Sequence, residues 1–185
     1  MINKIVETMY KENIVNDIDE ATYAITFLFE KVISIISLLI IGALFNKLTG
    51  VVLFIIIFCM LRRYTGGFHC NSFIACYFTS ILVMIAVIMI NLYCVISKTL
   101  LLIVLIVSGI IILYIGAINH PNMNWTINEK RHSISKARVT ICIECIITYI
   151  LLLHNIDTLI PYYMVSAITL CSLLLLLAKA TKQEV

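Results

Sequence analysis

One short stretch of the sequence, residues 62–76, concentrates the side chains that could do covalent chemistry. It contains two arginines, a Gly-Gly pair, His69, Cys70 and Cys76. A cysteine attacks as its thiolate, and a neighbouring histidine can take the thiol proton. An unperturbed thiol is only a few per cent ionised at neutral pH, so such a partner matters. The stretch therefore suggests a cysteine nucleophile with a histidine base.

The spacing favours Cys76 over Cys70 as the partner of His69. Cys70 is adjacent in sequence, whereas Cys76 lies seven residues on, two helical turns away and on the same helical face. Seven residues of regular helix rise by about 10 Å, which is too far for direct contact. We therefore expect a bend, for which Gly66 and Gly67 provide backbone freedom. The alternative is that His69 is an interfacial histidine and both cysteines are packing residues.

The elements that carry this stretch must lie in a membrane. The chain has 185 residues, of which 62% are hydrophobic and 12% charged, and its mean hydropathy is +1.09. Soluble domains have roughly a quarter charged residues, so much of this surface must face lipid. We expect one all-α, polytopic domain, 1–185, with membrane lipid as its surroundings. Seven cysteines, mostly within apolar runs, do not resemble a secreted disulfide framework.

The apolar runs predict about six transmembrane helices preceded by an amphipathic interfacial helix over residues 1–22. The expected spans are about 27–45, 51–63, 73–96, 100–118, 139–153 and 159–178, and a polar loop is expected over 119–138. The second run is short for a bilayer about 30 Å thick, so it must tilt or extend into its flanks. Arg62 and Arg63 are expected to end it. The first span, rather than a cleaved signal peptide, is expected to direct the chain to the membrane.

The distribution of lysine and arginine predicts the orientation. With both termini in the cytoplasm and six spans, the cytoplasmic segments hold ten of these residues and the outer turns hold two, Lys47 and Lys98. Lys31, within the first span, is not counted. This bias follows the positive-inside rule. It places residues 62–76 on the cytoplasmic side.

Several other residues are candidates for a role. Glu144 lies within the fifth expected span, where a carboxylate is a functional candidate by default; it would orient His69 or compensate Arg62, unless it simply reaches the interface. Cys142 and Cys145 form a Cys-x-x-Cys pair that suits packing better than zinc or redox chemistry, because no second ligand pair exists. Four cations are expected by topology alone and would also contact an acidic peptide: Lys130, Arg131, Lys136 and Arg138.

The stretch Arg62, Gly67, His69 and Cys76 resembles the signature of the accessory gene regulator B (AgrB) family of bacterial quorum-sensing membrane peptidases. In that family an arginine, a glycine, a histidine and, seven residues after the histidine, a cysteine stand at this spacing. The resemblance extends over the chain, through its length, its six spans and its basic loop between spans four and five.

The resemblance implies a cysteine endopeptidase of the bacterial cell membrane with a catalytic pair, His69 and Cys76. Similar enzymes remove the C-terminal tail of a small AgrD-like propeptide, hold the rest as an acyl-thioester, and support its closure to a thiolactone or lactone. Arg62 and Gly67 match family positions and would shape the site. A homodimer is also implied. The extra thiol Cys70 would be a spectator.

Other function classes fit the sequence less well. A small transporter or peptide exporter would need polar residues along its spans, and these are nearly pure isoleucine, leucine and valine. A membrane lipid transferase would need clustered aspartates for a divalent metal, and Asp17, Asp19 and Asp157 do not form such a cluster. We expect no cofactor, no metal and no nucleic-acid partner.

Overall fold

The computed structural model of the chain describes residues 10, 17–68, 72–118, 126–154 and 158–181, all of its regular elements there being helices. They are α2 (Ile18–Leu44), α3 (Leu48–Thr65), α4 (Phe73–Tyr93), α5 (Lys98–Ile115), α6 (Ile127–Leu153) and α7 (Leu159–Ala180). Four of them, α3, α4, α5 and α7, are long and apolar enough to cross a membrane. The all-α membrane class that the sequence predicts is thus confirmed.

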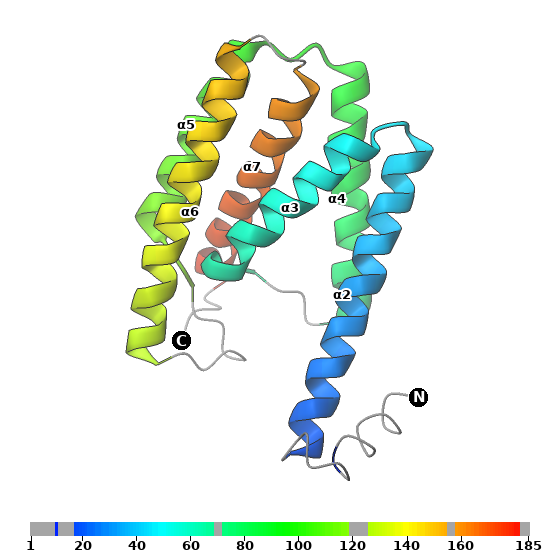
Figure 1. Cartoon of the computed structure of the whole chain (residues 1–185), viewed down its shortest axis with the longest axis vertical. Helices are drawn as coiled ribbons and strands as arrows, with labels where there is room; N and C mark the ends of the chain where they lie inside the picture. The colour runs from blue at the N-terminus through cyan, green and yellow to red at the C-terminus, as the bar shows by residue number, and fades with distance from the viewer. Residues whose placement is uncertain (1–9, 11–16, 69–71, 119–125, 155–157, 182–185) are drawn as a thin grey trace.

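Successive helices alternate in direction, so the bundle has two distinct ends (Figure 1). The ends of α3, α5 and α7 and the starts of α4 and α6 lie toward the lower end of Figure 1, where α2 also begins. The chemistry-bearing stretch and the basic segment of α6 therefore share one end of the molecule.

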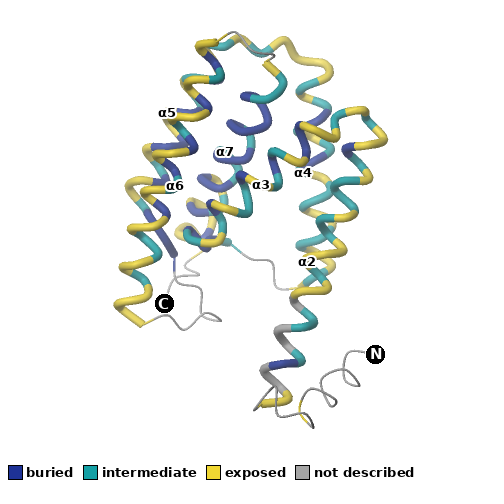
Figure 2. The backbone as a smooth tube through the Cα atoms, viewed as in Figure 1, coloured by how far each residue is buried: buried dark blue, intermediate teal, exposed yellow. Residues whose placement is uncertain are grey.

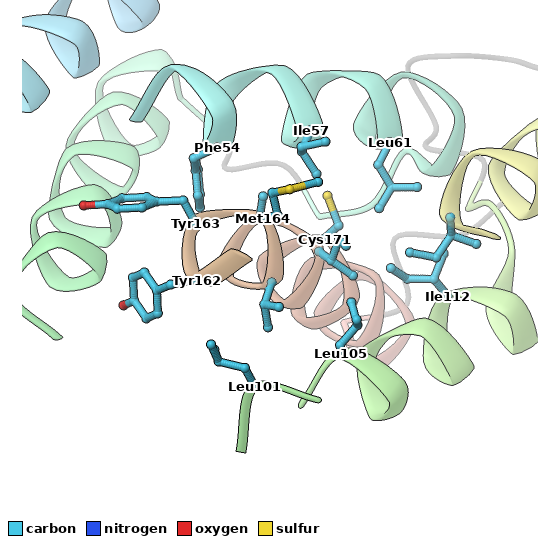
Figure 3. Packing of buried hydrophobic residues seen from close by; sticks show 14 of the residues in the cluster. Phe54, Ile57, Leu61, Leu101, Leu105, Ile112, Tyr162, Tyr163, Met164 and Cys171 are labelled. Carbon is cyan, nitrogen blue, oxygen red and sulfur yellow. The ribbon is translucent and has the colours of Figure 1, made fainter. Parts of the chain in front are cut away.

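The central helix is α7, which packs most extensively against α3 and then against α5. Figure 2 shows α7 as the most buried ribbon, with exposed positions gathered on the outer helices. Figure 3 shows Phe54, Ile57 and Leu61 of α3 facing α7, on which Met164 and Cys171 lie. The ring of Tyr163 in α7 lies against Gly50 of α3, where the side chain of any larger residue at position 50 would overlap it. The two helices therefore approach closely there.

The helix that carries Cys76, α4, is the least buried of the four apolar helices. Only 11% of its most apolar window is buried, compared with 56% for α7. Its described contacts are with α2 and, over a smaller surface, with α7. One of them is a hydrogen bond of 2.9 Å between the hydroxyls of Ser37 and Tyr77.

The helix bounds differ from the sequence prediction by a few residues at several ends, and three differences matter for the site. Residues 18–22, expected in the interfacial helix, belong to α2; residues 1–9 and 11–16 lie outside the described part. Arg62 and Arg63 do not end α3, which continues to Thr65, because cations are favourable at the carboxyl end of a helix. The helix ends at Gly66, which has a positive φ.

The third difference concerns the polar segment before the fifth expected span. The prediction of a loop over 119–138 is wrong from residue 127, where α6 begins. Thr126 caps the helix: its hydroxyl accepts from the Glu129 amide at 3.3 Å, and its own amide donates to the Glu129 carboxylate at 2.8 Å. This capping box supplies partners for amides that have none within the helix.

Candidate active site

The chemistry-bearing stretch begins where α3 ends in two glycines with positive φ. Gly66 has φ 61° and Gly67 has φ 111°, a region that side chains rarely adopt. A methyl group on Gly67 would also collide with the Arg62 guanidinium and approach the Leu174 carbonyl oxygen at 3.3 Å. The chain leaves α3 at these glycines and starts a new helix only at Phe73, and the expected fold-back of His69 toward Cys76 lies outside the described residues.

The side chain of Arg62 folds back over this turn. Its two terminal nitrogens, Nη1 and Nη2, donate hydrogen bonds to the carbonyl oxygens of Gly66 and Phe68. The guanidinium is planar and carries several donors in a fixed arrangement, which suits two carbonyls of one turn. Arg62 therefore fixes the conformation of the chain immediately before His69.

Two neighbouring elements hold the same turn from outside. The amide of Phe68 donates to the Leu174 carbonyl of α7 at 3.1 Å. The amide of Ile118, just beyond α5, donates to the Thr65 carbonyl at 2.9 Å, and Gly66 and Ile118 form a parallel β-bridge. The turn is thus attached to α7 and to the end of α5.

Cys76 lies in the first turn of α4. Its amide donates to the Ser72 carbonyl at 3.1 Å, and the Ser72 hydroxyl caps the helix by accepting from the Ala75 amide at 3.3 Å. The half-buried Cys76 thiol also interacts electrostatically with the charge of Arg62. A helix amino terminus and a nearby arginine both favour the thiolate over the thiol.

His69 and Cys70 lie outside the described residues, so the predicted His69–Cys76 pair stays a prediction. The chain on either side of them is described: it arrives at Phe68, fixed by Arg62 and Leu174, and continues at Ser72, the cap of α4. All six cysteines of the described part, Cys76 among them, are outside disulfides.

Glu144 is buried in the bundle, with 3% of its surface exposed. Neither carboxylate oxygen has a hydrogen-bond partner among the described residues. The prediction that it compensates Arg62 finds no direct ion pair between the two side chains. Burying a carboxyl group without a hydrogen-bond partner costs folding free energy, so Glu144 stays a candidate for a functional role.

The four predicted peptide-binding cations lie on α6 rather than in a loop. Arg131, Lys136 and Arg138 are exposed, and Lys130 is half-buried. Arg138 differs from the other three because its Nε donates to the Leu113 carbonyl in the last turn of α5, at 3.2 Å. Within the described part, no group of three His, Cys, Asp or Glu side chains could hold a metal ion.

A family model described as accessory gene regulator B (AgrB) matches residues 2–178. The chain belongs to the AgrB family. No curated protein and no solved structure matches it. AgrB membership connects this membrane protein with the processing of a quorum-sensing propeptide and implies an AgrD-like substrate.

Within this AgrB protein, two residues that hold the turn could not be found from the sequence. Ile118 and Leu174 act through backbone groups, which do not depend on residue type. The helical start of the basic segment did have a signal, the Thr126-x-x-Glu129 pattern of a capping box.

Proposed function

We propose that this chain is a membrane cysteine endopeptidase that cleaves the C-terminal tail from a small quorum-sensing propeptide. Cys76 is the nucleophile and His69 is its general base. The enzyme holds the remaining peptide as an acyl-thioester and supports its closure to a thiolactone or lactone. The proposal rests on AgrB membership together with the local environment of Cys76.

One observation about this chain carries the proposal furthest: Cys76 lies in the first turn of α4 and within the electrostatic reach of Arg62. Each feature lowers the free energy of the thiolate relative to the thiol. Five other described cysteines lack this combination, because Cys59, Cys94, Cys142, Cys145 and Cys171 lie outside the first turn of any helix.

The reaction proceeds by two acyl transfers. His69 takes the proton of the Cys76 thiol, and the thiolate attacks the carbonyl carbon of the scissile peptide bond. The C–N bond breaks as His69 returns the proton to the leaving amine, which departs as the amino terminus of the tail. A thiol or hydroxyl within the bound peptide then attacks the thioester, closes the ring and releases Cys76. A site that limits water favours this attack over hydrolysis.

The supporting residues act on the shape and charge of the site. Arg62 holds the turn before His69 and places a positive charge near Cys76, while Gly67 leaves the space that the guanidinium occupies. Glu144 is included because its carboxyl group is buried in the bundle without a hydrogen-bond partner among the described residues. None of the three takes part in bond making.

Three of the four basic residues of α6, Lys130, Arg131 and Lys136, are proposed to contact an acidic propeptide tail. They lie in the first half of α6, which begins toward the end of the bundle where α3 ends and α4 begins (Figure 1). This end is proposed to face the cytoplasm, with six membrane spans and both termini on that side. Membrane lipid surrounds the helices, and a homodimer remains a proposal from the family.

Co-expression with the cognate propeptide tests the proposal directly. We expect Cys76→Ala and His69→Ala to abolish cleavage, because each removes a group that takes part in bond making. Cys70→Ala is the matched control, since it removes a neighbouring thiol from the same stretch, and it should cleave normally. The measurement is the ratio of cleaved to intact propeptide by mass spectrometry, at equal membrane levels of the enzyme.

Two outcomes would contradict the proposal. Full cleavage by Cys76→Ala would exclude Cys76 as the nucleophile. Loss of cleavage in Cys70→Ala with normal cleavage in Cys76→Ala would move the nucleophile to Cys70. Export of the intact propeptide without cleavage would instead support the alternative of a transporter or peptide exporter.

A further inference from the structure

Arg138 differs from the other basic residues of α6 in what its side chain binds. Its Nε donates to the carbonyl of Leu113 at 3.2 Å. Leu113 lies in the last turn of α5, where carbonyl groups have no partner within the helix and the helix dipole is negative. A cation here stabilises the end of α5 rather than remaining available to a peptide.

The end of α5 has two further attachments at the same level. Lys179 of α7 places its ammonium 5.7 Å from the centre of the Tyr114 ring, a cation–π distance. Gly116, with φ 75°, lies so close to Ile134 of α6 that an added methyl carbon would be 2.9 Å from the Ile134 side chain. The segment that follows α5 is therefore fixed by α6 and α7 together.

This fixed segment is the one that holds the turn before His69. Ile118, two residues after Gly116, is buried, and its amide donates to the Thr65 carbonyl at 2.9 Å. The Ile118 carbonyl oxygen lies against Gly66, 2.6 Å from where a methyl carbon would be. A displacement of residues 116–118 would therefore move the glycine turn, to which Arg62 donates its hydrogen bonds.

We propose that Arg138 is a positioning residue of the active site rather than a substrate contact. It holds the last turn of α5, which holds Ile118 against Thr65 and Gly66, and so keeps Arg62 in the position from which its charge reaches Cys76. The inference rests on the proposed function for its role in catalysis. Its structural part concerns the reactivity of Cys76 and needs no substrate.

The test measures how fast N-ethylmaleimide alkylates Cys76 in the full-length chain in liposomes, as a function of pH. Site-resolved mass spectrometry gives the rate at Cys76 relative to the exposed Cys94. Arg138→Met removes the donor and keeps the length of the side chain. We expect the Cys76 profile to move to higher pH and the relative rate at neutral pH to fall several-fold. Arg138→Lys, which keeps a cation beside the carboxyl end of α5, should restore most of the rate.

Two further variants separate positioning from substrate binding. His132→Gln changes another exposed residue of α6 and should leave alkylation and cleavage at wild-type values. Lys136→Met should raise KM for a propeptide with an acidic tail without moving the alkylation profile. Arg138→Met should instead lower kcat with little change in KM, because the substrate does not contact it.

An unchanged alkylation profile in Arg138→Met would overturn the inference, and so would a rise in KM alone. Neither result bears on whether Cys76 cleaves the propeptide, which the Cys76→Ala comparison decides separately. A rise in the alkylation rate of the buried Cys171 in the same variant would indicate general unfolding, and Arg138→Lys then decides. A Cys76 profile equal to wild type in Arg138→Lys supports positioning, and one as shifted as that of Arg138→Met overturns it.

Discussion

At the scale of single residues, the candidate site depends on an arginine that binds its own backbone. Arg62 donates to the carbonyl oxygens of Gly66 and Phe68, so its charge is fixed in place rather than free to move. A fixed charge stabilises a thiolate without the cost of reorganising at the moment of reaction. The same side chain therefore shapes the turn and supplies the field at Cys76.

Gly67→Ala should lower propeptide cleavage at least tenfold. The new methyl group would overlap the Arg62 guanidinium, and φ 111° is strained for alanine, by about 1–3 kcal/mol for such conformations. The measurement is the initial rate of cleavage at equal enzyme levels in the membrane. Gly109→Ala is the matched control, because Gly109 is a buried helical glycine without positive φ, and we expect its rate to stay within twofold of wild type. Equal rates for the two variants would contradict the role assigned to the turn.

The sequence predicts which residues form the candidate site but not which groups keep the glycine turn in place. Residue type and spacing favour Cys76 as the partner of His69, and the family resemblance adds Arg62 and Gly67. The attachment of the turn to Leu174 and Ile118 is made by backbone groups of distant segments, which any residue except proline could provide.

At the scale of elements, α6 joins a polar half to an apolar half in one helix. The polar half begins at the capping box of Thr126 and Glu129. Hydrogen bonds from the Thr126 amide and hydroxyl lower the pKa of the Glu129 carboxyl below its ordinary value. The apolar pattern alone could predict only the second half, since a charged segment and a loop look alike in hydropathy.

Thr126→Ala should loosen the first turn of α6 without affecting the apolar half of this helix. Loss of a threonine cap raises the equilibrium constant for opening a terminal turn by about fivefold. Hydrogen–deuterium exchange of residues 127–136 measures this, and residues 140–150 are the internal control. Faster exchange in both segments would contradict a local role for the cap.

The same turn should weaken in acid. Because the pKa of Glu129 is lower in the folded state, its contribution is complete above the ordinary glutamate value and is lost as the pH falls through the folded value. We expect protection of the first turn of α6, corrected for intrinsic exchange, to fall below pH of about 4. Glu129→Gln should remove this pH dependence, and persistence of the dependence in that variant would assign it to another group.

At the scale of the whole molecule, alternating helix directions bring the site and the basic half of α6 to one end (Figure 1). The positive-inside bias predicts that this end faces the cytoplasm. A green fluorescent protein fused after residue 181 should therefore fluoresce, because it folds in the cytoplasm. Alkaline phosphatase fused after Asn46 or Ser97 should be active, because it needs the outer side. The reverse pattern would invert the proposed orientation.

The sparse packing of α4 has a consequence for how such an enzyme can diverge. Only Met84 and Ile88 of this helix are buried, whereas α7 contributes much of the core. Substitutions on the outer face of α4, such as at Ile74, Phe78 or Leu82, exchange one lipid-facing apolar residue for another and cost little folding free energy. The helix that carries Cys76 can therefore accumulate changes near the proposed nucleophile while the core stays intact. New propeptide preferences can arise there by small mutational steps.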